Sequence, residues 1–100
     1  MAGRPPVPVA LTSAQTNALE SILRRGSSVQ KLVRRARLVL ALDFCKYNQQ
    51  AADRAGVTRP TACTWRKRWI AASEKLQAVE ATGNEKELLK VIEDLLADLP

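Results

Sequence analysis

The segment from Asn48 to Trp69, NQQAADRAGVTRPTACTWRKRW, decides the fold, because a Gly-Val-Thr break separates two short helical runs within it. Asn48 can cap a first helix, QQAADRA, that stops at Gly56, and Thr58 can cap a second helix. Pro60 is tolerated in the first turn of that second helix, where its missing N–H costs little. Gly56 lets the chain leave the first helix in a conformation that a β-carbon resists. The segment therefore predicts two helices joined by one tight turn.

The apolar residues of this segment have the spacing of a helix-turn-helix unit, with Asn48 at its first position and Gly56 at its ninth. The usual apolar positions are then occupied by Ala51, Ala55, Val57, Ala62 and Trp65, with small Ala52 where the helices cross. On the second helix Ala62, Trp65 and Trp69 share one face, which we assign to the core. The opposite face, which would enter a major groove, carries Arg59, Pro60, Cys63, Thr64 and Lys67.

Charge is distributed unevenly along the chain. Residues 1–70 hold thirteen Lys and Arg against three acidic residues, a net of +10, whereas residues 71–100 hold three Lys against seven acidic residues, a net of −4. The formal net charge of +6 predicts an anionic partner, with nucleic acid ahead of an acidic protein or an anionic membrane. The acidic end is expected to face solvent, a protein partner or a further domain.

Several function classes find no support in the composition. Cys45 and Cys63 lie far apart in the sequence and histidine is absent, so we expect no metal site, no cofactor and no disulfide framework. Without a histidine, a Gly-rich phosphate loop or a nucleophile elbow, we expect no enzymatic activity and no small-molecule substrate. The proline-rich start is unlike a signal peptide and no apolar run has the length of a membrane span. The sequence therefore predicts a cytoplasmic protein without membrane contact, associated with the nucleoid if it binds DNA.

Three regions are expected: an extended N-terminal arm at 1–10, a helix-turn-helix DNA-binding domain at 11–70, and an acidic helical extension at 71–100. Prolines prevent a helix in the arm. Thr12 and Gln15 form a capping box that opens the first helix of the domain, and Gly26 would end that helix. Its apolar stripe consists of Leu11, Ala18, Leu19, Ile22 and Leu23.

The next helix is expected to open at Ser27 or Ser28, to run to Lys46, and to be central to the core. The stripe predicted to face the core is Leu32, Val33, Ala36, Val39, Leu40 and Phe44. Basic residues fill much of the remaining surface of its first half, either as a solvated face or as phosphate contacts: Lys31, Arg34, Arg35 and Arg37.

A last amphipathic helix is indicated near the end of the chain. Asn84 with Glu87 has the spacing of a capping box. The apolar positions that follow are Leu88, Leu89, Ile92, Leu95, Leu96 and Leu99. This face either packs against the first helices or forms a dimerisation or partner-docking surface over residues 84–99.

The phrases RRARLVL and AGVTRPTACTWRKRW, and the separation between them, resemble the N-terminal DNA-binding region of mariner-like DDE transposases from bacterial insertion sequences. The resemblance covers about residues 9–70. It implies an all-α, homeodomain-like or paired-type helix-turn-helix bundle, here with an additional C-terminal amphipathic helix, in which residues 58–68 form the recognition helix. In that family the region recognises the terminal inverted repeats of its own element, and a linker and a catalytic domain follow. The chain departs from the family pattern at Tyr47, Ala51, Cys63 and Thr64.

We therefore expect sequence-specific binding to double-stranded DNA. Arg59 is the candidate for a bidentate guanine contact, Cys63 and Thr64 for short contacts such as a thymine methyl, and Lys67 for a base or a nearby phosphate, with Pro60 on the same face. The residues expected to hold the DNA backbone are Gln49, Gln50, Thr58, Arg66, Arg68, Arg34, Arg35 and Lys46. Arg4 in the arm is a candidate for minor-groove contact.

Two alternatives remain open at this point. The chain could be a small transcriptional regulator that acts as a dimer through the same recognition helix. It could also be a protein-interaction module that uses its terminal helix, with DNA affinity incidental.

Overall fold

The computed structural model describes residues 8–25 and 30–97, and these residues form helices and no strand. The helices are α1 (Ser13–Arg24), α2 (Gln30–Phe44), α3 (Asn48–Ala55), α4 (Arg59–Ala81) and α5 (Glu85–Ala97). The predicted all-α class is confirmed. None of the helices in the described part of the chain is both long and apolar enough to cross a membrane.

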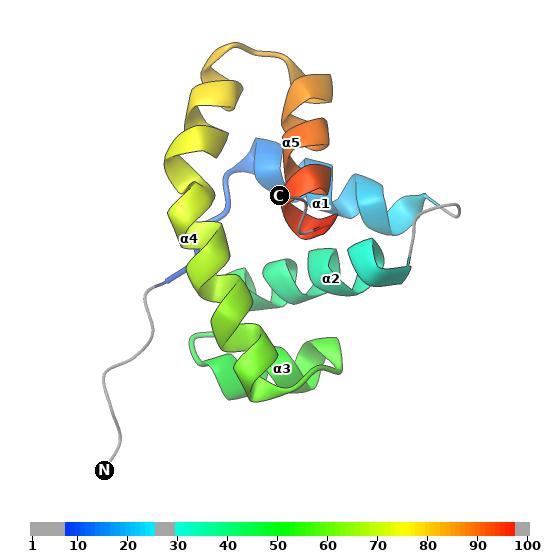
Figure 1. Ribbon diagram of the computed structural model, residues 1–100, viewed down its shortest axis with the longest axis vertical. Helices are drawn as coiled ribbons and strands as arrows, with labels where there is room; N and C mark the ends of the chain where they lie inside the picture. Colours follow the sequence, from blue (N-terminus) through cyan, green and yellow to red (C-terminus); the bar gives the residue numbers. More distant parts are fainter. Residues whose placement is uncertain (1–7, 26–29, 98–100) are drawn as a thin grey trace.

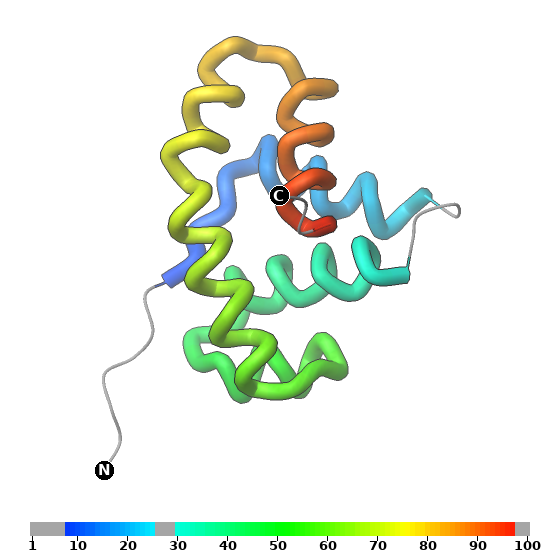
Figure 2. Tube along the Cα trace, in the orientation of Figure 1, coloured from blue at the N-terminus to red at the C-terminus, as the bar shows by residue number. Residues whose placement is uncertain are grey.

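Helix α2 lies at the centre of the bundle and contacts all four other helices. Figure 1 shows α4 rising along one side, α3 beneath α2, and α5 returning beside the second half of α4 toward α1. The tube in Figure 2 shows that α2 and α3 run in opposite directions. The beginning of α2 therefore lies near the turn between α3 and α4, and its end lies near the beginning of α3.

The central position of α2 explains why its predicted stripe was only partly correct. Ala36 and Val39 are buried as expected, but Leu38, Ala41 and Leu42, on other sides of the helix, are buried as well. A helix packed between two layers needs apolar residues on more than one face. Leu32, Val33 and Leu40 are half-buried.

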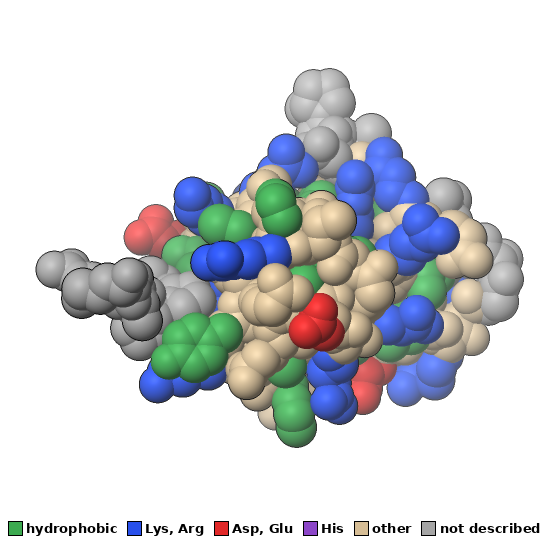
Figure 3. Space-filling view, turned by 90° about the horizontal axis from the view of Figure 1, so that it is seen from below, with side chains coloured by type: hydrophobic (Ala, Val, Ile, Leu, Met, Phe, Trp, Pro, Cys, Tyr) green, Lys and Arg blue, Asp and Glu red, His purple; other side chains and the backbone are tan. Residues whose placement is uncertain are grey.

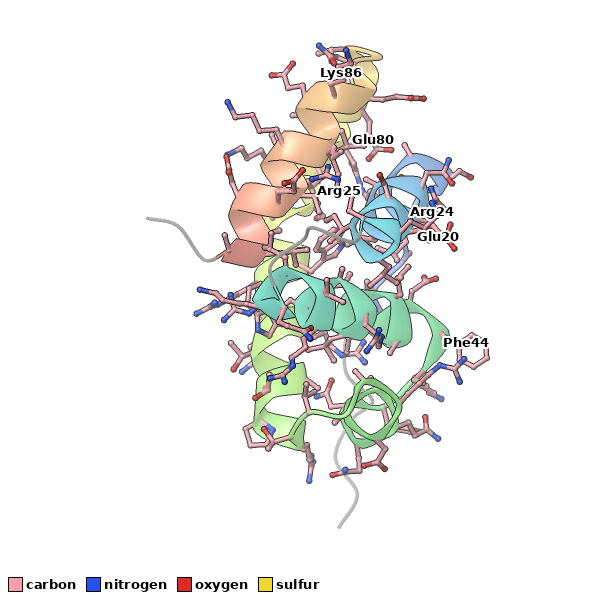
Figure 4. All side chains as sticks on the ribbon, turned by 90° about the vertical axis from the view of Figure 1, so that its right-hand side faces the viewer. Glu20, Arg24, Arg25, Phe44, Glu80 and Lys86 are labelled. Carbon is pink, nitrogen blue, oxygen red and sulfur yellow. The ribbon has the colours of Figure 1, made fainter. Side chains whose placement is uncertain are left out.

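Phe44 does not face the core. It is the last residue of α2, it is 74% exposed, and its ring projects away from the helices in Figure 4. Among the described residues, the Arg54 side chain of α3 lies over the ring but leaves most of it in solvent, so the prediction that Phe44 is a core residue was wrong.

The start of α1 is tied to the far half of α4. The predicted capping box is present: the Thr12 hydroxyl accepts from the Gln15 N–H at 3.1 Å, and the Gln15 side chain accepts from the Thr12 N–H. Glu80, which points toward α1 in Figure 4, accepts from the Thr12 hydroxyl at 2.6 Å and from the Gln15 amide at 2.8 Å. Just before the helix, Val9 is buried in the core whereas Pro8 and Ala10 are exposed, so the end of the predicted arm is held to the bundle by Val9.

The predicted domain boundary at residues 70 and 71 corresponds to no break in the structure. Helix α4 runs through it without interruption for 23 residues, with Ala62, Trp65, Trp69 and Leu76 buried along one side. Gly83 then turns the chain with φ of 75°, and the Asn84 side chain accepts from the Glu87 N–H at 3.1 Å to start α5. The acidic extension is therefore half of a continuous helix followed by a returning one.

The apolar face of α5 packs inside the chain. Leu88, Ile92 and Leu96 are buried, and α5 contacts α1, α2 and α4. Arg25 pairs with Glu93 at 2.8 Å, and Arg35 donates to the carbonyl of Leu96 near the end of α5. Of the two readings of this helix, packing against the first helices is the one observed.

Four sequence expectations lie outside the described residues: the Gly26 cap, the start of α2 at Ser27 or Ser28, the minor-groove role of Arg4, and Leu99.

Candidate nucleic-acid interface

The turn between α3 and α4 has the predicted construction. Gly56 adopts the left-handed conformation, with φ of 72°, and the Val57 N–H donates to the Ala52 carbonyl at 2.9 Å. Thr58 caps α4 by accepting from the Thr61 N–H at 3.4 Å, and Pro60 sits in the first turn. Val57 is half-buried in the angle between the two helices, against the core. The turn therefore sets the angle at which α4 leaves α3.

The packing of α3 against α4 decides which side of α4 reaches solvent. Ala51, Ala52 and Ala55 on α3 are buried together with Ala62, Trp65 and Trp69 on α4. Small residues at this crossing allow close approach of the two backbones. The opposite side of α4 carries the predicted base-reading residues, of which Arg59, Pro60, Thr64 and Lys67 are exposed and Cys63 is half-buried. The predicted core assignment of both tryptophans is confirmed.

The end of the molecule formed by α3 and the start of α4 is strongly basic at its edges. Figure 3, which views the molecule from this end, shows Lys and Arg side chains spread around the face and few acidic ones. Such a distribution attracts a polyanion toward this end of the bundle.

Arg66 lies in the interior, so its predicted contact with the DNA backbone is corrected. The residue is 3% exposed, and its Nε donates to the Asn48 side-chain oxygen at 2.7 Å. A second nitrogen of the guanidinium donates to the Lys46 carbonyl at 3.4 Å. Burial lowers the pKa of the Arg66 guanidinium, while the nearby thiols of Cys63 and Cys45 act in the raising direction. Arg66 is a positioning residue that fixes the beginning of α3 against α4.

The same contact changes the role of Asn48. Tyr47, and not Asn48, is the residue at the cap of α3, and its N–H donates to the Gln50 side chain at 3.4 Å. Asn48 is instead the first helical residue and accepts from Arg66. Gln49 donates to Asp53 at 2.8 Å on the helix surface. Both Gln49 and Gln50 remain exposed at the helix start, where backbone contacts were predicted.

Two arginines lie over the ring of Trp65. The Arg35 guanidinium is 4.7 Å from the ring centroid and the Arg68 guanidinium is 4.9 Å from it. Arg35 also donates to Leu96, so its guanidinium is held by α4 and α5 together. Arg68 is exposed, and its contact with a phosphate stays a prediction.

Two clefts lie near α3. The first, of about 240 Å³, is lined by Lys31, Arg34, Arg35, Leu38, Val57 and Thr61. The second is wider, about 570 Å³, and is lined by Phe44, Cys45, Lys46, Gln50, Asp53 and Arg54. The charged residues of the first cleft are all basic, whereas the second cleft pairs Lys46 and Arg54 with Asp53.

Comparisons with protein-family models, with curated proteins and with solved structures find no match. The resemblance to transposase DNA-binding regions therefore stays a prediction.

Sequence reasoning missed three features of the interface. Arg54 lies over the exposed Phe44 ring at 4.3 Å, and Lys46 lies over the Tyr47 ring at 5.5 Å. The sequence also did not show that Lys31 and Arg34 lie in one cleft with Thr61. The spacing of three residues between Lys31 and Arg34 indicates only that they share a face of α2. The pairing with Thr61 depends on how α2 crosses α4, and no local pattern contains that information.

No group of three or more metal-ligating side chains occurs among the residues that the structure describes. Cys45 and Cys63 are free thiols and both are half-buried.

Proposed function

We propose that this chain is a sequence-specific reader of double-stranded DNA, with the homeodomain-like helix-turn-helix formed by α2, α3 and α4. We further propose that it recognises the terminal inverted repeats of a transposon as the N-terminal region of a transposase. The observation that carries the proposal is the exposed face of α4, where Arg59, Thr64 and Lys67 have no role in the core. Such side chains at the start of a projecting helix are suited to base edges.

The dimensions of α4 agree with this role. Arg59 and Lys67 are eight residues apart, which corresponds to about 12 Å along a helix axis at 1.5 Å per residue. The major groove of B-DNA is about 12 Å wide and admits one helix. A recognition helix lies along the groove, so its diameter of about 10–12 Å is what must match the groove width, and the first turns of α4 meet this condition.

The flanking basic residues suit the two strands that border the groove. Lys31 and Arg34 lie beside the turn and line the first cleft, whereas Lys46, just before α3, and Arg54, in its last turn, line the second. Phosphate contacts on both sides fix the register of a recognition helix and supply most of the salt-dependent affinity.

The packing of α5 supports a DNA reader over a protein-interaction module. A partner could reach the apolar face of α5 only if Leu88, Ile92 and Leu96 left the core. The same burial makes these residues poor candidates for a dimer interface. A dimeric regulator would use the same face of α4 on DNA, and sedimentation at micromolar concentration would separate it from a monomer.

The proposal is tested by selection from a random duplex pool at about physiological salt, followed by a salt titration of the winning site. We expect a motif of several base pairs bound about a thousandfold more tightly than random duplex. Binding without enrichment that disappears as salt rises would refute sequence-specific reading, because non-specific attraction to a basic face behaves in that way.

Arg59→Ala tests the orientation of α4 in the groove. We expect a loss of about 1–3 kcal/mol in binding free energy and relaxed preference at one base pair of the selected site. Lys75→Ala, an equal charge change on the exposed far half of the same helix, is the matched control and should leave base preference unchanged. Unaltered affinity and preference in Arg59→Ala would mean that another face of the bundle meets the bases.

A further inference from the structure

The cleft beside the α3–α4 turn has the composition of a phosphate site. Lys31, Arg34 and Arg35 contribute three positive charges from successive turns of α2, and Thr61 contributes a hydroxyl from the first turn of α4. Leu38 and Val57 complete the lining. None of the described residues that line this cleft is acidic. Its volume of about 240 Å³ exceeds the roughly 30 Å³ of one water several times over, so a group larger than water can enter.

Two of the three charges are available to a ligand. Within the part of the chain that the structure describes, the side chains of Lys31 and Arg34 form no hydrogen bond or ion pair, and both residues are exposed. Arg35 differs, because the carbonyl of Leu96 and the ring of Trp65 hold its guanidinium in place. It supplies a fixed positive charge at the cleft, while Lys31 and Arg34 can move to meet an anion.

The threonine pair adds a directed donor. The hydroxyls of Thr58 and Thr61 lie 2.8 Å apart. When the Thr58 hydroxyl donates to Thr61, the hydrogen of Thr61 is free to donate to an oxygen at the cleft. Thr61 belongs to the same helical turn as Arg59 and Pro60, at the edge of the candidate base-reading face.

We propose that this cleft binds one phosphate of the DNA backbone, on the strand that borders the major groove at the turn, through Lys31, Arg34 and Thr61. The inference rests on the proposed function for the identity of its ligand. It assigns Lys31 and Thr61 to DNA binding and separates Arg34, which would touch the phosphate, from Arg35, which orders the site. One seated phosphate beside the first turn of α4 fixes how deeply that helix enters the groove.

The test is a double-mutant cycle that combines substitutions in the protein with neutralisation of single phosphates in the selected duplex. Uncharged methylphosphonate replaces one phosphate at a time, and affinities are measured for the wild type, for the Lys31→Ala/Arg34→Ala variant, and for Arg37→Ala. Arg37 is an exposed arginine on the same helix that does not line the cleft, so it controls for loss of charge on α2. All three positions are exposed, and thermal unfolding verifies that each variant is folded.

We expect one phosphate whose neutralisation weakens wild-type binding about fivefold and leaves the binding of the double variant nearly unchanged. The salt slope of the double variant should fall by about 1, as for one lost phosphate contact. The Arg37→Ala variant should keep the full penalty at that phosphate. Thr61→Val should weaken the same coupling without changing the net charge.

The possible results separate this inference from the proposed function. If each methylphosphonate that weakens wild-type binding about fivefold also weakens binding by the double variant about fivefold, the cleft does not bind a phosphate. Sequence-specific DNA binding would be unaffected by that result. If the wild type binds no duplex at all, the proposed function fails, and inorganic phosphate becomes the probe. Titration with phosphate is then followed by the NMR shifts of the Val57 and Thr61 amides. Saturable shifts that vanish in the double variant would show that the cleft binds an anion, and the absence of such shifts would overturn the inference.

Discussion

Replacement of Arg66 by methionine tests whether this residue positions α3 against α4 or contacts DNA. The guanidinium is buried and joins the beginning of α3 to α4 through Asn48 and the Lys46 carbonyl. Arg66→Met keeps most of the length and the apolar stem of the side chain but removes its charge and its donors. We therefore expect loss of stability with the DNA-facing charges unchanged.

The magnitude follows from two of the contacts that Arg66 makes. The bond from Nε to Asn48 is short, at 2.7 Å, and its donor is charged, whereas the bond to the Lys46 carbonyl, at 3.4 Å, is weak. Hydrogen bonds to charged groups contribute about 1.5–3 kcal/mol, and most of the loss comes from the shorter one. We expect the free energy of unfolding to fall by about 2–3 kcal/mol, which lowers Tm by roughly 10–20 °C in a domain of this size.

Urea unfolding followed by circular dichroism measures the change, with Lys67→Met as the matched control on the neighbouring exposed residue. The control should stay within about 0.5 kcal/mol of the wild type, as surface substitutions do. At a temperature where Arg66→Met is folded, its salt slope for DNA should equal that of the wild type. A variant of unchanged stability whose salt slope falls by about 1 would refute the reasoning and restore Arg66 as a phosphate contact.

Three further substitutions test the fold. Phe44→Ala should cost less than about 1 kcal/mol in urea unfolding, because most of the ring is exposed and its contact with Arg54 contributes little there; a cost of about 3–5 kcal/mol would mean that it is a core residue. Gly56→Ala should cost roughly 1–2 kcal/mol from left-handed backbone alone, since an added Cβ meets no atom within 4 Å, and an unchanged Tm would contradict the αL assignment. Ile92→Ala should cost about 2–5 kcal/mol because its side chain is fully buried, whereas unchanged stability would place α5 outside the core.

The predictions that held depend on neighbours in sequence. The Thr12 and Gln15 capping box, the Thr58 cap and the left-handed Gly56 each involve groups within a few residues of one another. The helical period also placed Trp65 and Trp69 together on the buried side of α4. Such interactions are determined by local geometry, so the amino-acid order is enough to predict them.

The predictions that failed concern long side chains and helix ends. Arg66 follows Trp65 by one residue, about 100° around the helix, so it lies at the edge of the buried stripe. At that position the helical periodicity is compatible with a buried side chain and with an exposed one. Its burial required Asn48 to be brought alongside by the crossing of α3 and α4. Phe44 had core spacing but no helix beyond the end of α2 to cover it.

The sequence by itself determined that the chain is helical, the turn between α3 and α4, and the face of α4 that carries Arg59 and Lys67, because caps and periodicity act over one or two helical turns. Only the tertiary structure decided that α5 folds back into the core, that Arg35 orders a cleft while Arg34 pairs with no described residue, and that Thr61 and Lys31 line the same cleft. Those relations join residues 30 to 61 positions apart in the chain. They arise from the packing of whole helices, which the local pattern around any one residue does not contain.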